Sequence, residues 1–222
     1  MNIPDTDQPS NIYVPGLPGL NVSERTPDIH NRYSDKEVAL LPLLNETHPR
    51  YREWTGRAAA SDRLVRYLSA HKRSAGILEI GCGNGWLSHR LAAVPGSRVV
   101  GLDSNLGELR QAARIFRKQP NLKFIYGEFY SNVLQDLSFD IIVLAATVHC
   151  FHRPAQIIRD AVGYLRPRGE LHIIDSALLQ SDLGAFNHRY LYNPHSIWSR
   201  FRRKSSPFPW VCIFAQPQGK NG

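Results

Sequence analysis

Three glycines lie within five residues directly after a short apolar run. The run is Gly76 to Ile80 (GILEI), and the loop that follows reads Gly81-Cys82-Gly83-Asn84-Gly85. Glycine lets the main chain adopt conformations closed to other residues and lets a ligand approach it closely. The free N–H groups of a helix that begins at Trp86 then face an anionic or polar ligand group. The loop therefore predicts a ligand site at the end of a strand.

A carboxylate completes this pattern. Asp103 ends the next apolar run, 18 residues after Gly85. At the end of the second strand of a nucleotide-binding unit, a carboxylate accepts hydrogen bonds from ribose hydroxyls. The two features together predict a ribose-bearing ligand, whereas a glycine-rich loop alone is weak evidence. The structural alternative is that the glycines form a tight turn and Asp103 caps the next helix.

The glycine spacing separates two nucleotide classes. A dinucleotide motif usually reads G-x-G-x-x-G, and its last glycine lets helix and strand pack closely. Here the loop reads G-x-G-x-G, and Trp86 stands where that last glycine belongs. No Gly-Lys-Ser/Thr follows, so a phosphate-binding P-loop is excluded. An NAD-linked Rossmann protein stays open as an alternative, with Trp86 against it.

From residue 76 onward, short apolar runs alternate with helical stretches. This alternation predicts βαβ units with right-handed crossovers and a mainly parallel sheet. The fold class is therefore α/β, a doubly wound Rossmann-like sheet. The expected strands are 76–80, 98–102, 122–126, 139–146, 170–176 and 210–215, and the expected helices are 86–94, 106–118, 154–165 and 196–203.

The first 48 residues are expected to form an irregular arm with one short helix. Five prolines before residue 28 argue against a helix or sheet there. Ser34 and Glu37 have the spacing of a capping box, and Pro42 should end the helix that follows. A longer helix is expected from near Pro49 to about Ala70. Residues 49–222 then form the main domain, with a core at 76–176 and a C-terminal helix and strand at 177–222.

Composition limits the class of protein. The chain has 222 residues, 42% of them hydrophobic, which is enough for a sizeable core. No apolar run reaches the length of a membrane span, and the N-terminus shows no signal-peptide pattern. Three cysteines without a CxxC favour a reducing, cytoplasmic setting and argue against a metal site. The net charge is +8, and the basic C-terminal part either attracts nucleic acid or is a solvated face.

The motifs together resemble the class I S-adenosylmethionine-dependent methyltransferases. The resemblance spans residues 76–176 and rests on ILEIGCGNGWLSHRLA, VVGLDSN, NLKFIYGEF and the stretch from FDIIVLAA to ELHIID. It implies S-adenosylmethionine as cofactor, with Asp103 on the ribose and Glu128 with Phe129 at the adenine. Tyr33 is expected as a lid and Arg57 at the cofactor carboxylate. The full implied set is Tyr33, Arg57, Glu79, Gly81, Cys82, Gly83, Asn84, Gly85, Asp103, Ser104, Glu128, Phe129 and Ala145, with no metal.

The methyl acceptor is not declared by these motifs. The fourth strand ends in LAATVHCF, which lacks both the Asn/Asp-Pro-Pro-Tyr of amine-modifying members and the Pro-Cys of cytosine enzymes. His149 follows that strand and is the candidate general base, because histidine changes charge near neutral pH. The alternatives for His149 are a helix cap or a packing role. A small-molecule acceptor leads, with RNA methylation through the basic C-terminal segment, or cofactor binding without catalysis, as alternatives.

The C-terminal part is short for this family. Only 46 residues follow Ser176, where the family has a last helix and a terminal strand hairpin. The expectation is that one strand of that hairpin is shortened or missing.

Overall fold

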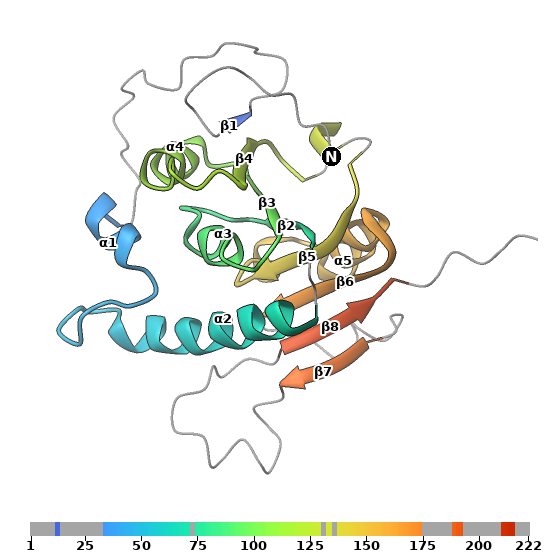
Figure 1. The fold of residues 1–222 in the computed structure, drawn as a ribbon, viewed down its shortest axis with the longest axis horizontal. Helices are drawn as coiled ribbons and strands as arrows, with labels where there is room; N and C mark the ends of the chain where they lie inside the picture. Colours follow the sequence, from blue (N-terminus) through green and yellow to red (C-terminus); the bar gives the residue numbers. More distant parts are fainter. Residues whose placement is uncertain are drawn as a thin grey trace, which may run out of the picture.

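A computed structural model describes residues 12–13, 33–71, 74–129, 132–134, 137–174, 188–192 and 210–215. Its centre is an eight-stranded sheet in the order β1-β4-β3-β2-β5-β6-β8-β7 (Figure 1). The pairs from β1 to β6 are all parallel, and β8 pairs antiparallel with both β6 and β7. The strands are β1 (Ile12–Tyr13), β2 (Gly76–Ile80), β3 (Arg98–Asp103), β4 (Leu122–Tyr126), β5 (Phe139–Ala145), β6 (Leu165–Ile174), β7 (His188–Tyr192) and β8 (Trp210–Phe214).

The sheet is doubly wound, as the sequence predicts. From β2 the chain moves outward through β3 and β4, and it then returns to place β5 on the other side of β2. The direction of winding therefore reverses between β2 and β5. In open α/β sheets, ligands bind outside the carboxyl ends of the strands at such a reversal. Ile80 and Ala145 end these two strands, so the loops after them flank the expected site.

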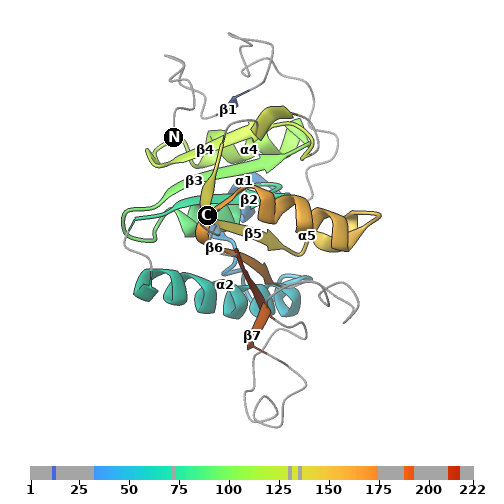
Figure 2. The ribbon, with the colours of Figure 1, turned by 90° about the vertical axis from the view of Figure 1, so that its right-hand side faces the viewer.

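Helices cover both faces of the sheet, with α2, α3 and α4 on one face and α5 on the other (Figures 1 and 2). Alternate residues of the strands face opposite sides of the sheet. Ile77 belongs to the apolar cluster that includes residues of α2, α3 and α4, and Leu78 belongs to the cluster that includes residues of α5. Full burial of both residues matches the continuous apolar runs of central parallel strands. The helices are α1 (Asp35–Leu40), α2 (Tyr51–His71), α3 (Trp86–Leu91), α4 (Leu106–Ile115) and α5 (Pro154–Gly163), with 3-10 turns η1 (Asn132–Leu134) and η2 (Val148–Cys150).

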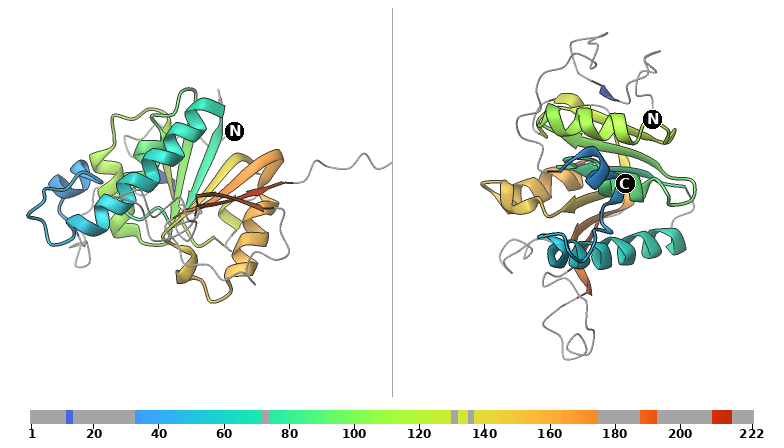
Figure 3. Two further views of the ribbon diagram at one scale, coloured as in Figure 1. Left: turned by 90° about the horizontal axis from the view of Figure 1, so that it is seen from below. Right: turned by 90° about the vertical axis from the view of Figure 1, so that its left-hand side faces the viewer.

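The short N-terminal helix begins with the capping box that the sequence predicts. The Ser34 hydroxyl accepts from the Glu37 N–H, and a Glu37 carboxylate oxygen accepts from the Ser34 N–H at 2.7 Å. The helix α1 ends at Leu40, two residues before Pro42. It lies against α4, as Figure 3 shows, and the Arg114 guanidinium forms an ion pair with Asp35 across that contact at 2.8 Å. The ion pair attaches the arm to the domain.

Some sequence predictions are wrong in detail. The arm contains β1, because Ile12 and Tyr13 pair with the exposed edge of β4. Both terminal strands, β7 and β8, are present, so neither strand of the hairpin is missing. The helices α3 and α4 end three residues earlier than their apolar patterns suggest, and β6 begins already at Leu165. The helix expected at 196–203 lies outside the described residues.

Among the described helices, none combines the length and the apolar composition that a bilayer-crossing segment needs.

Candidate cofactor-binding site

A cavity of about 1070 Å³ opens at the carboxyl ends of the central strands. Its walls come from the loop after β2, the ends of β3 and β5, the loop after β4 and the first half of α2. Residues from distant parts of the sequence therefore meet at the reversal point of the sheet. The predicted site residues that line it are Tyr33, Arg57, Glu79, Gly81, Cys82, Gly83, Asn84, Asp103, Ser104, Glu128, Phe129, Ala145 and His149.

Backbone hydrogen bonds hold the glycine loop in place. The N–H groups of Gly81 and Cys82 donate to the Leu102 carbonyl at 2.8 and 3.1 Å. The Gly83 N–H donates to Asp103 Oδ2 at 2.7 Å, and the Asn105 N–H donates to Asp103 Oδ1 at 2.7 Å. Asp103 thus connects the loop after β2 to the start of α4. Each carboxylate oxygen has a second lone pair, so Asp103 can still accept from a ligand.

The backbone at Gly81 and Gly83 favours glycine, and at Gly81 a side chain would also collide with Thr147. Both have a positive φ, +73° and +51°, which non-glycine residues rarely adopt. A Cβ on Gly81 would collide with the Thr147 hydroxyl, and one on Gly83 would lie 2.7 Å from Glu108 Oε2. The loop therefore exposes bare main chain to the cavity between α4 and the end of β5. Bare main chain of this kind is compatible with the close approach of a ligand that the sequence predicts.

Gly85 serves a different purpose from the one expected. It does not line the cavity. With a φ of +73°, it precedes α3, and a Cβ there would lie 2.7 Å from Phe124 Cζ and 2.9 Å from Ala112 Cβ. Glycine at this position lets the loop pack closely on β4 and α4. The contact of Gly85 is thus with the protein core.

Glu79 is a buried carboxyl at the floor of the cavity. One of its carboxyl oxygens accepts a hydrogen bond from the Ser88 hydroxyl. Ser88 lies in α3, the helix that follows the glycine loop. Burial raises the pKa of Glu79 to about 8; the Ser88 hydrogen bond opposes this rise and the nearby charge of Asp103 adds to it. Glu79 is therefore largely protonated at neutral pH when the cavity holds no cation. A cationic ligand group beside it favours the ionised form.

Cys82 contributes its main chain to the cavity, whereas its side chain belongs to the core. Only 3% of the residue is exposed, and its thiol lies against Gly101, where a Cβ would be 2.8 Å from Sγ. Burial raises the pKa of the Cys82 thiol well above its ordinary value. A thiol that stays protonated is a poor nucleophile. Cys82 is thus a packing residue within the ligand loop.

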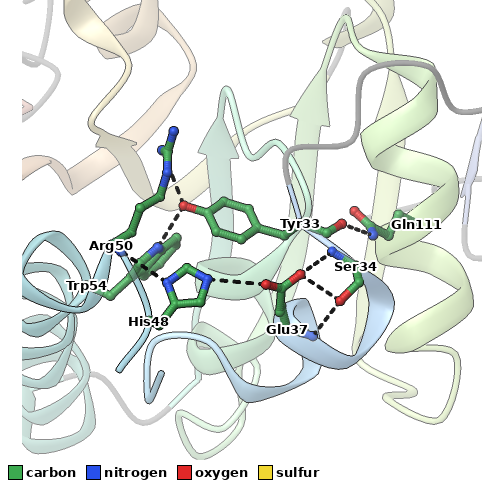
Figure 4. Close-up of polar contacts among 7 residues, drawn as sticks. All are labelled: Tyr33, Ser34, Glu37, His48, Arg50, Trp54 and Gln111. Carbon is green, nitrogen blue, oxygen red and sulfur yellow. Dashed lines mark hydrogen bonds and ion pairs between the residues drawn. The ribbon is translucent and has the colours of Figure 1, made fainter. Parts of the chain in front are cut away.

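Three aromatic side chains, Tyr33, Trp54 and Trp86, form part of the cavity wall. Trp54 packs edge-on against Tyr33 and Trp86, with ring centroids 5.7 and 5.0 Å apart. The Trp54 Nε1–H donates to the Tyr33 hydroxyl oxygen at 2.9 Å (Figure 4). The Arg57 guanidinium lies 4.9 Å from the centroid of the Trp54 ring and forms an ion pair with Glu53 at 3.0 Å. Trp54 thus contacts both Tyr33 and Arg57, and all three line the cavity.

The candidate general base, His149, lies shortly after the end of β5. Ala145 lines the cavity, and Ala146 has an unusual positive φ of +52°. Such a backbone position is strained for a non-glycine residue and occurs often at functional sites. It turns the chain so that buried Thr147 packs on Gly81, while exposed His149 lies in η2 at the cavity. His149 and the glycine loop therefore line the same cavity.

Several cavity-lining residues are outside the predicted cofactor set, among them Trp54, Trp86, Glu108 and Thr147. Trp54 and Trp86 occupy ordinary helical positions, and Glu108 stands in the first turn of α4, where an acidic residue is common. Thr147 follows a strand without any local motif. The acid in the first turn after Asp103 was a usable signal for Glu108. The other three reach the cavity only through tertiary packing.

Among the described residues, four carboxyl groups line the cavity, and Glu79 among them becomes charged when a cation lies beside it. The carboxylic acids are Glu79, Asp103, Glu108 and Glu128, and the one arginine among the cavity's described lining residues is Arg57. Such a lining attracts a cationic ligand more than an anionic one. A sulfonium with an ammonium group carries this kind of charge. A carboxylate at Asp103, bare glycine main chain and an acidic floor together fit S-adenosylmethionine.

A second buried polar cluster lies outside the cavity. Glu170, His172 and Cys212 place one ligand-type atom each within 4.8 Å of one another. The Trp210 Nε1–H donates to His172 Nδ1 at 3.1 Å, so Nε2 carries the ring proton and donates to Glu170 at 3.1 Å. A metal needs a free lone pair on the ring, and both nitrogens are in use. The cluster therefore has the hydrogen bonding of a structural network between β6 and β8.

Comparison with known proteins agrees with this geometry. Residues 77–169 match the family model of a methyltransferase domain. Over 118 residues, the chain is 30% identical to malonyl-[acyl-carrier protein] O-methyltransferase of Halalkalibacterium halodurans, covering 49% of this chain and 44% of that protein. Over 160 residues, it is 28% identical to 27-O-demethylrifamycin SV methyltransferase of Amycolatopsis mediterranei, covering 71% and 54%. The chain spans about half the length of the curated relatives that it matches.

The solved structures show the same fold. A methyltransferase from Aquifex aeolicus, described as dependent on S-adenosylmethionine, superposes with a TM-score of 0.54 over 82% of this chain and 98% of that one, at 14% identity. At this identity the likeness concerns the fold alone. The matched domain at residues 77–169, with its glycine loop and Asp103, supports a class I S-adenosylmethionine-dependent methyltransferase domain, with S-adenosylmethionine as the cofactor of that domain.

Proposed function

We propose that this protein transfers a methyl group from S-adenosylmethionine to a small organic acceptor. The observation that carries the proposal is a single cavity that joins the glycine loop to His149 beyond β5. At about 1070 Å³, the cavity is larger than the roughly 300–1,000 Å³ of pockets for one drug-sized ligand. It therefore has room for the cofactor and a second molecule of modest size. The cofactor supplies an activated methyl group on its sulfonium.

The cofactor-binding roles follow from position and chemistry. Asp103 accepts the ribose hydroxyls through the lone pairs that Gly83 and Asn105 leave open. Glu79 lies below the loop and balances the cofactor's ammonium group. Arg57 reaches the cavity from α2 and meets its carboxylate. Glu128 and Phe129 follow β4, where a carboxylate and an apolar ring suit the amine and the face of adenine. The remaining predicted residues that line the cavity supply main chain or wall.

The acceptor is proposed to enter on the side of His149. Methyl transfer requires a nucleophile held in line with the sulfonium, which is mainly a matter of proximity and orientation. An acceptor hydroxyl or similar group also has to lose a proton, and exposed His149 is the histidine nearest in sequence to the end of β5. The two relatives named above act on a carrier-bound malonyl group and on a rifamycin. Both names support an acceptor of small-molecule type.

Labelled methyl transfer tests the proposal and separates its two acceptor classes. Purified protein is incubated with methyl-labelled S-adenosylmethionine and either a small-metabolite fraction or total RNA. We expect label in the metabolite fraction and none above background in RNA. Label in RNA, lost steeply as salt rises, would instead favour the basic C-terminal segment as a phosphate-binding surface. Cofactor binding without transfer to any fraction would identify a non-catalytic cofactor-binding protein.

Replacing His149 with alanine is expected to lower the rate of methyl transfer by about 10²- to 10⁴-fold, because positioned general bases contribute factors of this size. Affinity for S-adenosylhomocysteine should stay within about twofold, because His149 lies on the acceptor side. Single-turnover rates and calorimetry measure the two quantities. His152→Ala is the matched control, since His152 also lines the cavity and is exposed. An equal rate loss in both variants would contradict the assignment of His149 as the base.

A further inference from the structure

The hydroxyl of Tyr33 is held by two donors at the wall of the cavity. Trp54 Nε1–H donates to it at 2.9 Å, and an Arg50 guanidinium nitrogen donates to it at 3.4 Å (Figure 4). A tyrosine hydroxyl has two lone pairs, so both are now in use. Its own hydrogen meets no acceptor among the described residues. Tyr33 is only 8% exposed and lines the cavity, so this hydrogen is available to a bound ligand.

One end of Tyr33 is fixed through its backbone. The Gln111 side-chain amide, from α4, donates to the Tyr33 carbonyl at 2.8 Å. The next residue, Ser34, is held by the capping box with Glu37, whose carboxylate accepts from the Ser34 N–H at 2.7 Å and from its hydroxyl at 2.6 Å. These bonds lower the pKa of Glu37, with the Ser34 hydroxyl as the main cause. The carboxylate is therefore ionised and available to a further donor.

His48 provides that donor and connects Glu37, next to the Tyr33 backbone, with Arg50, which contacts the Tyr33 hydroxyl. The Arg50 backbone N–H donates to His48 Nδ1 at 3.1 Å, so Nδ1 has no hydrogen of its own. The hydrogen is then on Nε2, which donates to Glu37 Oε1 at 3.2 Å. The His48 ring also lies beside the Tyr33 ring, with centroids 6.3 Å apart. Figure 4 shows the resulting chain of contacts from Ser34 through Glu37 and His48 to Arg50.

We propose that His48 is a positioning residue for the cofactor: it couples the capping box of α1 to the Arg50 backbone and thereby holds Tyr33 against the cavity. The Arg50 side chain and Trp54 then keep the Tyr33 hydroxyl in one orientation. His48 itself does not line the cavity and acts only through these neighbours. The inference rests on the proposed function, since it assumes that the cavity binds S-adenosylmethionine.

The two ring nitrogens can be replaced one at a time. An asparagine oxygen matches the position of Nδ1 and can accept from the N–H two residues later, as in an Asx turn. His48→Asn therefore retains the bond to Arg50 and loses the bond to Glu37. His48→Gln has the opposite effect, and His48→Ala loses both. The control is His71→Ala, at the exposed far end of α2.

A double-mutant cycle with Tyr33→Phe separates positioning from simple loss of structure. We expect His48→Ala to weaken binding of S-adenosylhomocysteine about fivefold, the scale of one hydrogen bond. In the Tyr33→Phe background the same change should cost less than twofold, because residues that act through one another are not additive. His48→Asn and His48→Gln should each retain part of the affinity, and His71→Ala should equal wild type. Melting temperatures of the ligand-free proteins show whether every variant is folded.

Three results would overturn the inference. The first is an unchanged affinity in His48→Ala with an unchanged melting temperature. The second is an equal loss in the wild-type and Tyr33→Phe backgrounds, which would indicate a structural role only. If His48→Ala does not fold, equal affinities of wild type, His48→Asn and His48→Gln would also contradict it. Wild-type protein that binds no S-adenosylhomocysteine would contradict the proposed function itself, and the role of His48 would fall with it.

Discussion

Replacing Gly85 with alanine is expected to lower the free energy of unfolding by roughly 2 to 5 kcal/mol. The left-handed backbone costs an L-residue about 1–2 kcal/mol, and overpacking a core costs about 1–3 kcal/mol. Both costs apply, because φ is +73° and the new Cβ would lie 2.7 Å from the buried Phe124 ring. Urea unfolding of the ligand-free protein measures the change. The loss should be present without any cofactor, since Gly85 packs on the core.

Gly163→Ala is the matched control for this prediction. Gly163 ends α5, and a Cβ there would meet no atom within 4 Å. Alanine reduces the conformational entropy of the unfolded chain, so the control should be stabilised by up to about 1 kcal/mol. Equal stability of Gly85→Ala and wild type, with weaker cofactor binding alone, would contradict the packing role. It would return Gly85 to the ligand-contacting role that its motif suggests.

Replacing Glu79 with glutamine is expected to remove most of the decrease in stability between pH 5 and pH 8. Burial raises the pKa of Glu79 from 4.5 to about 8 in the folded protein. The folded state therefore retains a proton that the unfolded chain releases. This contribution is complete below pH 4.5 and is lost as the pH rises to 8, by at most about 1.4 kcal/mol per pH unit. Glutamine stays neutral throughout and can still accept from the Ser88 hydroxyl.

The measurement is the difference between wild type and variant in urea unfolding at pH 5, 6, 7 and 8. We expect Glu79→Gln to gain stability relative to wild type by about 1 kcal/mol per unit above pH 5. Glu46→Gln, at an exposed carboxylate, should follow the wild-type curve. Parallel curves for wild type and Glu79→Gln would show that Glu79 is already ionised at neutral pH. The same variant should bind the cationic cofactor more weakly, because it cannot become negatively charged.

The central layers of the fold were predictable because their causes are local. The apolar runs 76–80 and 139–145 are long enough to identify strands buried on both faces, and the helices between them impose parallel pairing. β1 was not predictable, because two residues form a strand only where the edge of β4 is available. The three extra residues expected in α3 and α4 continue an apolar pattern, but the turns after Leu91 and Ile115 end each helix first.

The same distinction between local causes and tertiary contacts applies to the residues of the site. The position of Gly81, Gly83 and Asp103 at the cavity was predictable, because it depends on the local backbone, which a sequence motif records. Gly85 belongs to the same motif, but here glycine is needed because a side chain would collide with Phe124 in β4. Tyr33 was expected as a lid, yet the hydrogen bonds near it depend on how the loop before α2 lies on α1, where His48 meets Glu37. Sequence spacing does not encode such contacts between a loop and a helix.

Calorimetric titration with S-adenosylhomocysteine, with NAD as comparator, tests the central claim most directly. The control for Asp103→Ala is Asp140→Ala, because Asp140 Oδ2 accepts from the Gly76 N–H at 2.7 Å, at the opposite end of β2. We predict micromolar binding of the homocysteine by wild type and Asp140→Ala, a loss of tenfold or more in Asp103→Ala, and no heat with NAD. Binding of NAD without binding of the homocysteine, or equal affinity in all three proteins, would contradict the account.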